Sequence, residues 1–247
     1  MGILDQFRKA HSSGAKWLAV LIDPDIMSDR QRLDHTLDAI SKSRVDLILV
    51  GGSLLLTDHF NSCVRDVKSR VKQPVVIFPG SAQQVSPDAD AILFLSLISG
   101  RNPELLIGQH VMAAPAIREH NLEAIPTGYM LIDGGKPTTA SYISGTLPIP
   151  HDKPGIAAAT AMAGEMLGLG CIYLDTGSGA ELSVSPQMIR SVRKAVNTPL
   201  MVGGGIRNAE TAEDAWSAGA DIVVIGTAFE ENPDLLPALS WSAVRTA

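Results

Sequence analysis

Eight short runs of Val, Ile and Leu recur along the chain, and this repetition constrains the fold more than any other feature. Each run is continuously apolar instead of alternating, which is typical of parallel strands covered on both faces. The runs span residues 18–22, 47–50, 75–78, 91–95, 129–132, 172–174, 200–202 and 222–225. Eight such strands in about 250 residues predict an α/β fold of the TIM (β/α)8 barrel type.

Segments with helical periodicity lie between these runs, the clearest at 29–41, 58–71, 186–196 and 209–218. Three of them follow an expected N-cap, namely Ser28, Ser185 and Asn208. The connection 98–128 is long for one unit, so extra helices or a bend are expected there. A doubly wound sheet usually opens with GxGxxG, which this chain lacks. Since no linker divides the chain, residues 1–247 are expected to form a single barrel domain.

Composition and charge exclude several classes of protein. The net charge of -6 argues against non-specific binding of nucleic acid, which needs a basic face. The first residues lack the long apolar region of a secretory signal, and no run reaches the roughly 20 apolar residues of an integral membrane segment. We therefore expect a cytoplasmic protein. Cys63 and Cys171 lack metal-ligand spacing and are interpreted as reduced structural thiols.

Conventional catalytic patterns are also missing. None of the six histidines stands at a strand end beside a second metal-type ligand. No GxSxG nucleophile elbow follows a strand, so the sequence does not support a Ser-His-Asp triad.

Glycines gather where the last two strands end, and active sites of barrels lie at this rim. Gly204 and Gly205 follow the seventh strand, and Gly226 and Thr227 follow the eighth. Their bare backbone N–H groups predict a phosphate cradle of the kind formed by these two loops. The alternative interpretation is that each glycine only turns the chain.

An acid ends the first strand and another ends the sixth. Asp23 is a suitable ligand for a hard cation, and Ser53 could add an oxygen from the neighbouring strand. The alternative is that Asp25 caps the next helix while Asp23 only holds the turn. Asp175 ends the sixth strand and is followed by glycines and hydroxyls that could close around a ligand.

These strand-end motifs together resemble one family over nearly the whole chain. They are "LIDPD" (21–25), "VGGS" (50–53), "FPG" (78–80), "YLDTGSGA" (173–180), "VGGGIR" (202–207) and "IGT" (225–227). In this order they are similar to the geranylgeranylglyceryl phosphate synthases and their PcrB relatives. The segment 131–168 resembles the middle of the same family.

The resemblance implies a prenyltransferase with Mg²⁺ as cofactor, which joins sn-glycerol 1-phosphate to C1 of a polyprenyl diphosphate. The bond that forms would be the first ether bond of a phospholipid. The resemblance also implies Asp23 and Ser53 as the metal site. The implied substrate-binding residues are Tyr173, Leu174, Asp175, Thr176, Gly177, Ser178, Gly179, Gly204, Gly205, Gly226 and Thr227. Asp175 is the candidate catalytic residue, either as a base or only as a ligand of the hydroxyls. Family members also assemble as homo-oligomers, and the same is expected here.

Two positions depart from the family pattern. Leu21 stands where one branch has a lysine, so diphosphate charge falls to Mg²⁺ or to another cation, with Lys136 and Lys153 as unranked candidates. Asp175 stands where many members have Glu, which is one methylene longer. Farnesyl, geranylgeranyl and heptaprenyl tails remain open, with geranylgeranyl favoured by the resemblance. The competing interpretations are a sugar-phosphate isomerase, a thiamine-phosphate-type synthase, or a non-catalytic protein that binds a phosphate ligand.

Overall fold

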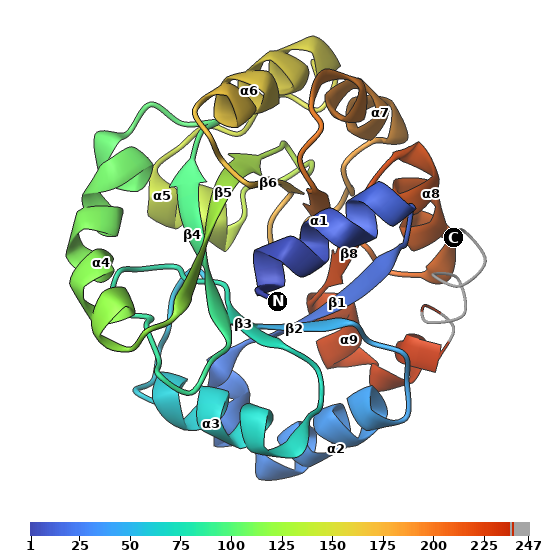
Figure 1. Cartoon of the computed structure of the whole chain (residues 1–247). Coiled ribbons are helices and arrows are strands. Elements are labelled where there is room, and N and C mark those ends of the chain that lie inside the picture. The colour runs from blue at the N-terminus through green and yellow to red at the C-terminus, as the bar shows by residue number, and fades with distance from the viewer. Residues whose placement is uncertain (238, 240–247) are drawn as a thin grey trace.

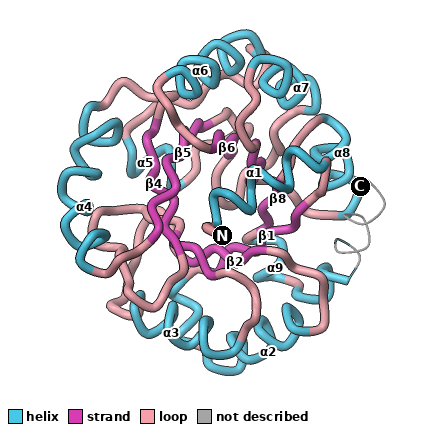
Figure 2. The backbone as a smooth tube through the Cα atoms, viewed as in Figure 1, coloured by secondary structure: helices cyan, strands magenta, loops and turns pink. Residues whose placement is uncertain are grey.

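The computed structural model describes residues 1–237 and 239, and its centre is a closed barrel of eight parallel strands in chain order (Figures 1 and 2). The strands are β1 (Trp17–Ile22), β2 (Leu47–Val50), β3 (Val75–Ile77), β4 (Ala91–Leu97), β5 (Glu123–Leu131), β6 (Cys171–Asp175), β7 (Leu200–Gly203) and β8 (Ile222–Ile225). The predicted (β/α)8 barrel is confirmed. β5 begins earlier than predicted, because its first residues pair with β4 from Glu123 onward.

Alternation along each strand separates the interior of the barrel from the layer under the helices. In β6, Tyr173 packs inside the barrel, whereas Ile172 and Leu174 pack outward in the larger core with the helices. This period of two also turns Asp175 inward, at the last position of the strand.

An outer ring of helices surrounds the barrel in Figure 2. It consists of α2 (Arg30–Ser41), α3 (Phe60–Arg70), α4 (Gln109–Glu119), α6 (Pro154–Met166), α7 (Pro186–Ala195) and α8 (Ala209–Ala218), and the short helices α5 (Thr139–Ser144) and α9 (Thr227–Glu231) lie inside it. The predicted caps Ser185 and Asn208 are confirmed, since their side chains accept hydrogen bonds from backbone N–H groups three residues on. Ser28 is wrong as a cap. Asp29 caps α2 instead, because Ser28 belongs to a preceding 3₁₀ turn, Pro24–Ser28.

A further helix, α1 (Ile3–Ser13), lies across one end of the barrel (Figure 1). Its Phe7 is fully buried in the barrel core and meets Trp17 edge to face at 5.7 Å. The N–H groups of Ile3 and Leu4 donate to the carboxylate of Glu123, at the start of β5. The carboxylate thus satisfies two free donors of the helix N-terminus. α1 closes the N-terminal end of the barrel, and the strand C-termini surround the other end.

One of the eight units lacks its helix. Residues 78–90 connect β3 to β4 through turns alone, with Pro79–Gly80 at the start. The long connection 98–128 holds a π-type turn, Glu104–Gly108, followed by α4. Without a helix after β3, the loop residues 78–82 lie on the same cavity as residues of β4 and α4. None of the helices in the described part of the chain combines the length and apolar character that crossing a membrane requires.

Candidate functional site

A cavity of about 840 Å³ opens at the C-terminal ends of the strands, within the range of ligand pockets. The sequence-predicted site residues that line it are Asp23, Ser53, Tyr173, Asp175, Gly177, Ser178, Gly179, Gly204, Gly205, Gly226 and Thr227. Leu174 does not line it, because its side chain faces the helices. Thr176 lies just beneath the surface of the cavity and is buried. The barrel therefore gathers residues from five of its units around one cavity, which we call the mouth cavity.

The loops after β6, β7 and β8 form a tight backbone cradle. Gly204 has φ +78°, and a Cβ there would overlap Thr176 Oγ1 and come within 2.7 Å of Asp175 Oδ1 and the Gly177 nitrogen. Only glycine permits this close approach. Ser178 Oγ and Thr227 Oγ1 lie 2.8 Å apart and tie two of the loops together. Such a cradle of N–H and hydroxyl groups suits a phosphate.

One buried polar atom beneath this cradle lacks a partner. Thr176 is 1% exposed, and its Oγ1 has no hydrogen-bond partner among the residues that the structure describes. A buried hydroxyl without a partner is uncommon in native structures. The atom is therefore suited to accept or donate a hydrogen bond once a ligand or water fills the cradle.

Asp175 is held on both of its oxygens. The O–H of Tyr129 donates to Oδ2 at 2.6 Å, and the N–H of Gly177 donates to Oδ1 at 2.7 Å. The carboxylate is only 6% exposed, and burial raises its pKa above the usual range, although both hydrogen bonds act in the opposite direction. A carboxylate of raised pKa at a ligand cavity is suited to accept a proton.

Tyr129 was missed from the sequence. It lies in an apolar run that reads as core, "TGYML" (127–131), and its partner is 46 residues away. The only signal of a functional role was its place on β5: it faces inward and lies two residues before the strand ends at Leu131.

Asp23 caps the 3₁₀ turn with only one of its two carboxylate oxygens, as far as the described residues show. Its Oδ1 accepts from the N–H of Asp25 at 3.0 Å. A Cβ on Gly52 would come within 2.9 Å of Oδ2, so this glycine keeps the space in front of Oδ2 open. The interpretation of Asp25 as the cap is wrong, because the carboxylate of Asp25 instead accepts from Thr57 Oγ1 at 2.8 Å.

The mouth cavity fits a magnesium ion only in partnership with substrate oxygens. Within the described part of the chain, no group of three His, Cys, Asp or Glu residues could hold a metal by itself. Asp23 and Ser53 offer two oxygen ligands in the segments that follow the neighbouring strands β1 and β2. This fits Mg²⁺, which is commonly bound by one or two carboxylates together with substrate phosphates and water.

The structure separates the two candidate lysines. Lys136, in the loop after β5, lines the mouth cavity. Lys153 lies outside that lining and pairs with Asp152 at 2.9 Å. Leu21 also lines the cavity, near Gly226, and brings no charge to it. Of the two candidates, Lys136 is therefore the lysine that shares the mouth cavity with the predicted metal residues.

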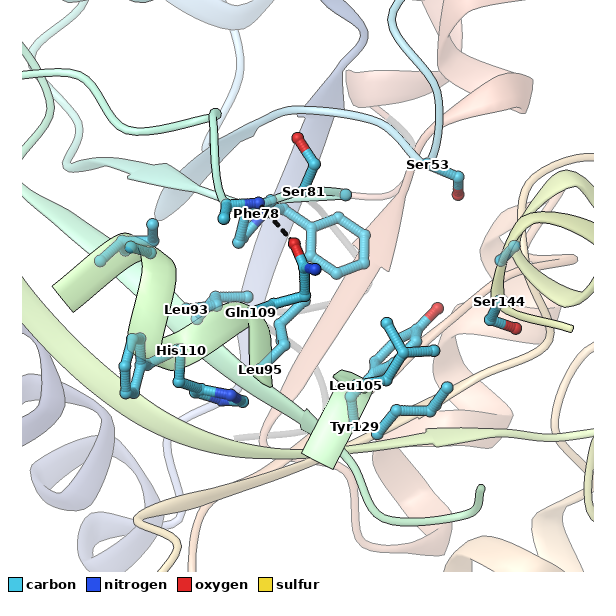
Figure 3. A pocket seen from close by; sticks show the side chains of 18 of the residues that line it. Ser53, Phe78, Ser81, Leu93, Leu95, Leu105, Gln109, His110, Tyr129 and Ser144 are labelled. Carbon is cyan, nitrogen blue, oxygen red and sulfur yellow. Dashed lines mark hydrogen bonds between the residues drawn. The ribbon is translucent and has the colours of Figure 1, made fainter. Parts of the chain in front are cut away.

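A second, apolar cavity lies beside β4 (Figure 3), and it shares four lining residues with the mouth cavity. Its walls come from the loop after β3, the strand β4 and the helix α4. Leu93, Leu95 and Leu105 line it, with Phe78 and Tyr129 near the barrel axis. Leucines and aromatic rings line this cavity together with small residues such as Gly80 and Ala113.

Phe78 lines both cavities, as do Gly52, Ser53 and Ala140. The Phe78 ring meets the rings of Tyr129 and Tyr173 at 5.7 and 5.4 Å, and these two tyrosine rings are 5.5 Å apart. This aromatic cluster of Phe78, Tyr129 and Tyr173 stands between a polar cavity and an apolar one. A ligand with a phosphate end and a hydrocarbon end could lie across it.

A barrel with a glycine cradle after β7 and β8, an acid at the end of β6 and an adjoining apolar cavity defines a phosphate-ligand barrel of the TIM class. A model of the PcrB family matches residues 14–240, so this chain belongs to the PcrB family. It is 52% identical to the geranylgeranylglyceryl phosphate synthase of Spirosoma linguale over 92% of this chain and 91% of that protein. It is 42% identical to the synthase of the same name from Korarchaeum cryptofilum, over 96% and 95% of the two chains.

Solved structures agree with this placement. The chain matches (S)-3-O-geranylgeranylglyceryl phosphate synthase from Thermoplasma acidophilum, in complex with sn-glycerol-1-phosphate, with a TM-score of 0.90 and 31% identity. The match covers 100% of this chain and 98% of that one. Thiamine phosphate pyrophosphorylase from Pyrococcus furiosus matches with a TM-score of 0.58 at 12% identity, which is a likeness of fold alone.

Proposed function

We propose that this chain is a prenyltransferase that forms the ether bond between sn-glycerol 1-phosphate and geranylgeranyl diphosphate. The observation that carries the proposal is the junction of the two cavities at Phe78. The polar cavity offers a phosphate cradle and a carboxylate, and the apolar cavity offers a place for a hydrocarbon tail. An isomerase of sugar phosphates would need the first cavity but not the second.

The residues suggest how the ether forms. The phosphate of glycerol phosphate lies on the cradle of Gly204, Gly205 and Gly226, with its free hydroxyls toward Asp175. The 3-hydroxyl oxygen attacks C1 of the prenyl group, its proton passes to Asp175, and the C1–O bond breaks. The electron pair of that bond leaves with diphosphate. Holding both reactants in this geometry removes much of the entropic cost of their encounter.

Asp23 and Ser53 would hold Mg²⁺ together with diphosphate oxygens. When bound, the ion neutralises the charge that develops on the leaving group. Because Asp23 keeps Oδ2 free beside Gly52, its carboxylate is available for this role without losing its hydrogen bond to the Asp25 N–H.

Product formation tests the proposed function directly. Purified protein is incubated with radiolabelled glycerol 1-phosphate, Mg²⁺ and farnesyl, geranylgeranyl or heptaprenyl diphosphate, and lipid-soluble label is extracted. Label in the organic phase with the geranylgeranyl substrate is the expected result. No organic-phase label with any tail would refute the function.

The metal role is tested with Asp23→Asn and its neighbour Asp25→Asn as the matched control. Asp23→Asn should lose Mg²⁺-dependent turnover by a factor of at least one hundred, because a metal contact stabilises the leaving group by several kcal/mol. Turnover within about threefold of the unmodified protein would contradict the assignment.

Lys136 is proposed to supply the positive charge that Leu21 cannot. Lys136→Ala should raise the KM for geranylgeranyl diphosphate by about tenfold or more, since a charge-assisted hydrogen bond contributes roughly 1.5–3 kcal/mol. Lys153→Ala is the control, and its KM should stay within about twofold. Equal effects of the two substitutions would refute this ranking.

We also propose a cytoplasmic homo-oligomer. Exposed apolar side chains support self-association, among them Leu147 in the loop between α5 and α6, and Met166 and Leu167 at the end of α6, each about four-fifths exposed or more. An exposed tryptophan is a common interface anchor, but Trp216 cannot act as one. It is 1% exposed, and its N–H donates to the backbone oxygen of Trp17 at 3.2 Å. Trp241 lies outside the described residues. Sedimentation velocity at micromolar concentration tests the assembly.

A further inference from the structure

We infer that Tyr129 is a positioning residue, which holds the Asp175 carboxylate in the orientation that proton transfer requires and links it to the apolar cavity. This inference deepens the proposed function and rests on it. The evidence is a set of contacts around one carboxylate at the junction of the two cavities.

Two fixed donors determine the orientation of Asp175. The Tyr129 hydroxyl comes from β5, which pairs in register with β6, and the Gly177 N–H comes from the loop that follows β6. Each donor holds a different carboxylate oxygen, so the group cannot rotate about its last bond without losing both hydrogen bonds. Each oxygen keeps further lone-pair capacity for a substrate hydroxyl.

Tyr129 is itself held in place from both sides. It is 8% exposed, and its ring packs edge to face against Phe78 and Tyr173. The same residue lines the apolar cavity, whereas its hydrogen-bond partner Asp175 lines the mouth cavity. A hydrocarbon tail in the apolar cavity would therefore contact Tyr129, and the hydroxyl of the same side chain holds Asp175 in the mouth cavity.

The charges around Asp175 make this hydroxyl important. The carboxylate faces Tyr129 from β5, Tyr173 from β6, the Gly177 N–H and Thr176 from the following loop, and the Gly204 backbone from beyond β7. No lysine, arginine or histidine of the described residues forms an ion pair with it. Burial raises the pKa of the Tyr129 phenol well above its usual value, so the hydroxyl stays protonated and remains a donor.

The sign of the effect of removing that hydroxyl follows from these contacts. Burial raises the pKa of Asp175, and the hydrogen bond from Tyr129 lowers it by favouring the charged form. Without the hydroxyl, the pKa should rise further. Loss of a hydrogen bond to a charged group changes the pKa of that group by about one to two.

The test is the pH dependence of kcat in Tyr129→Phe, which keeps the ring and removes only the oxygen. The acid limb, where Asp175 must lose its proton, should move upward by about one to two pH units. Below that limb kcat should fall about ten- to one-hundredfold, and it should partly recover at higher pH. The KM for each substrate should stay within about threefold. Tyr142→Phe is the control, because that tyrosine is exposed on α5, and its profile should match the unmodified protein.

A purely structural role would lower the unfolding temperature and kcat at every pH without moving the acid limb, and an unmoved limb overturns the inference. The titration of Asp175 is also followed without turnover, by ¹³C NMR of aspartate-labelled protein with Asp175→Asn used to assign the signal. If the unmodified protein makes no ether product, the proposed function fails, while this titration still decides the inference. An unchanged carboxyl pKa in Tyr129→Phe would overturn it.

Discussion

Substituting Gly204 by alanine tests the phosphate cradle most directly, because the structure separates two costs. The first is backbone strain: Gly204 has φ +78°, and a residue with a Cβ pays about 1–2 kcal/mol in this left-handed region. The second is overlap, since the Cβ would meet Thr176 Oγ1 and approach Asp175 Oδ1 and the Gly177 nitrogen to 2.7 Å. Overpacking of a tight site typically adds about 1–3 kcal/mol.

Gly14 provides a matched control for the strain alone. It ends α1 with φ +74°, and a Cβ there would meet nothing within 4 Å. Gly14→Ala should therefore carry only the first cost. At about 2–4 °C per kcal/mol for a chain of this size, the unfolding temperature of Gly204→Ala should fall about 2–12 °C further than that of Gly14→Ala.

Kinetics then separate the cradle from general stability. Below the unfolding temperature, Gly204→Ala should raise the KM for glycerol 1-phosphate at least about tenfold, the effect of losing roughly 1.4 kcal/mol of binding. Gly14→Ala should leave this KM unchanged. The reasoning is refuted if both variants lose the same stability and Gly204→Ala binds glycerol 1-phosphate normally.

Three further predictions concern other buried groups. Asp175→Asn should lower kcat about 10²- to 10⁴-fold. Calorimetry should also show that this variant becomes more stable relative to the unmodified protein as the pH increases above the unfolded carboxyl pKa. The reason is that burial raises the pKa of Asp175 in the folded state, so ionisation of this carboxylate destabilises only the unmodified protein. Asp221→Ala should cost about 3–5 kcal/mol in urea denaturation, since it leaves the largely buried Arg193 without the carboxylate 3.0 Å away; Asp5→Ala, which removes an exposed pair, should cost less than about 1 kcal/mol. Burial raises the pKa of Cys63 to about 12, so native protein should resist iodoacetamide at pH 8, and rapid labelling of this thiol would contradict its burial.

Several features of the fold and site follow from local sequence. Continuous apolar runs identify strands covered on both faces, and their number determines closure into a barrel. In a parallel barrel every strand ends at the same rim. Residues far apart in sequence, such as Asp23, Asp175 and Gly204, therefore share one cavity. This grouping can be predicted without knowing any side-chain contact.

Contacts between strands were decided only by the tertiary structure. Tyr129 reaches Asp175 because β5 and β6 pair in a particular register, which no local pattern encodes. The apolar cavity exists only where the loop after β3, the strand β4 and the helix α4 meet in the folded chain. Likewise Asp23 rather than Asp25 caps the turn, because Thr57 from a distant loop engages Asp25. The sequence by itself determined the barrel and the rim that carries the chemistry, because periodicity and strand ends are local. Register, packing and hydrogen-bond partners are long-range, so only the folded chain decided which side chain holds the carboxylate.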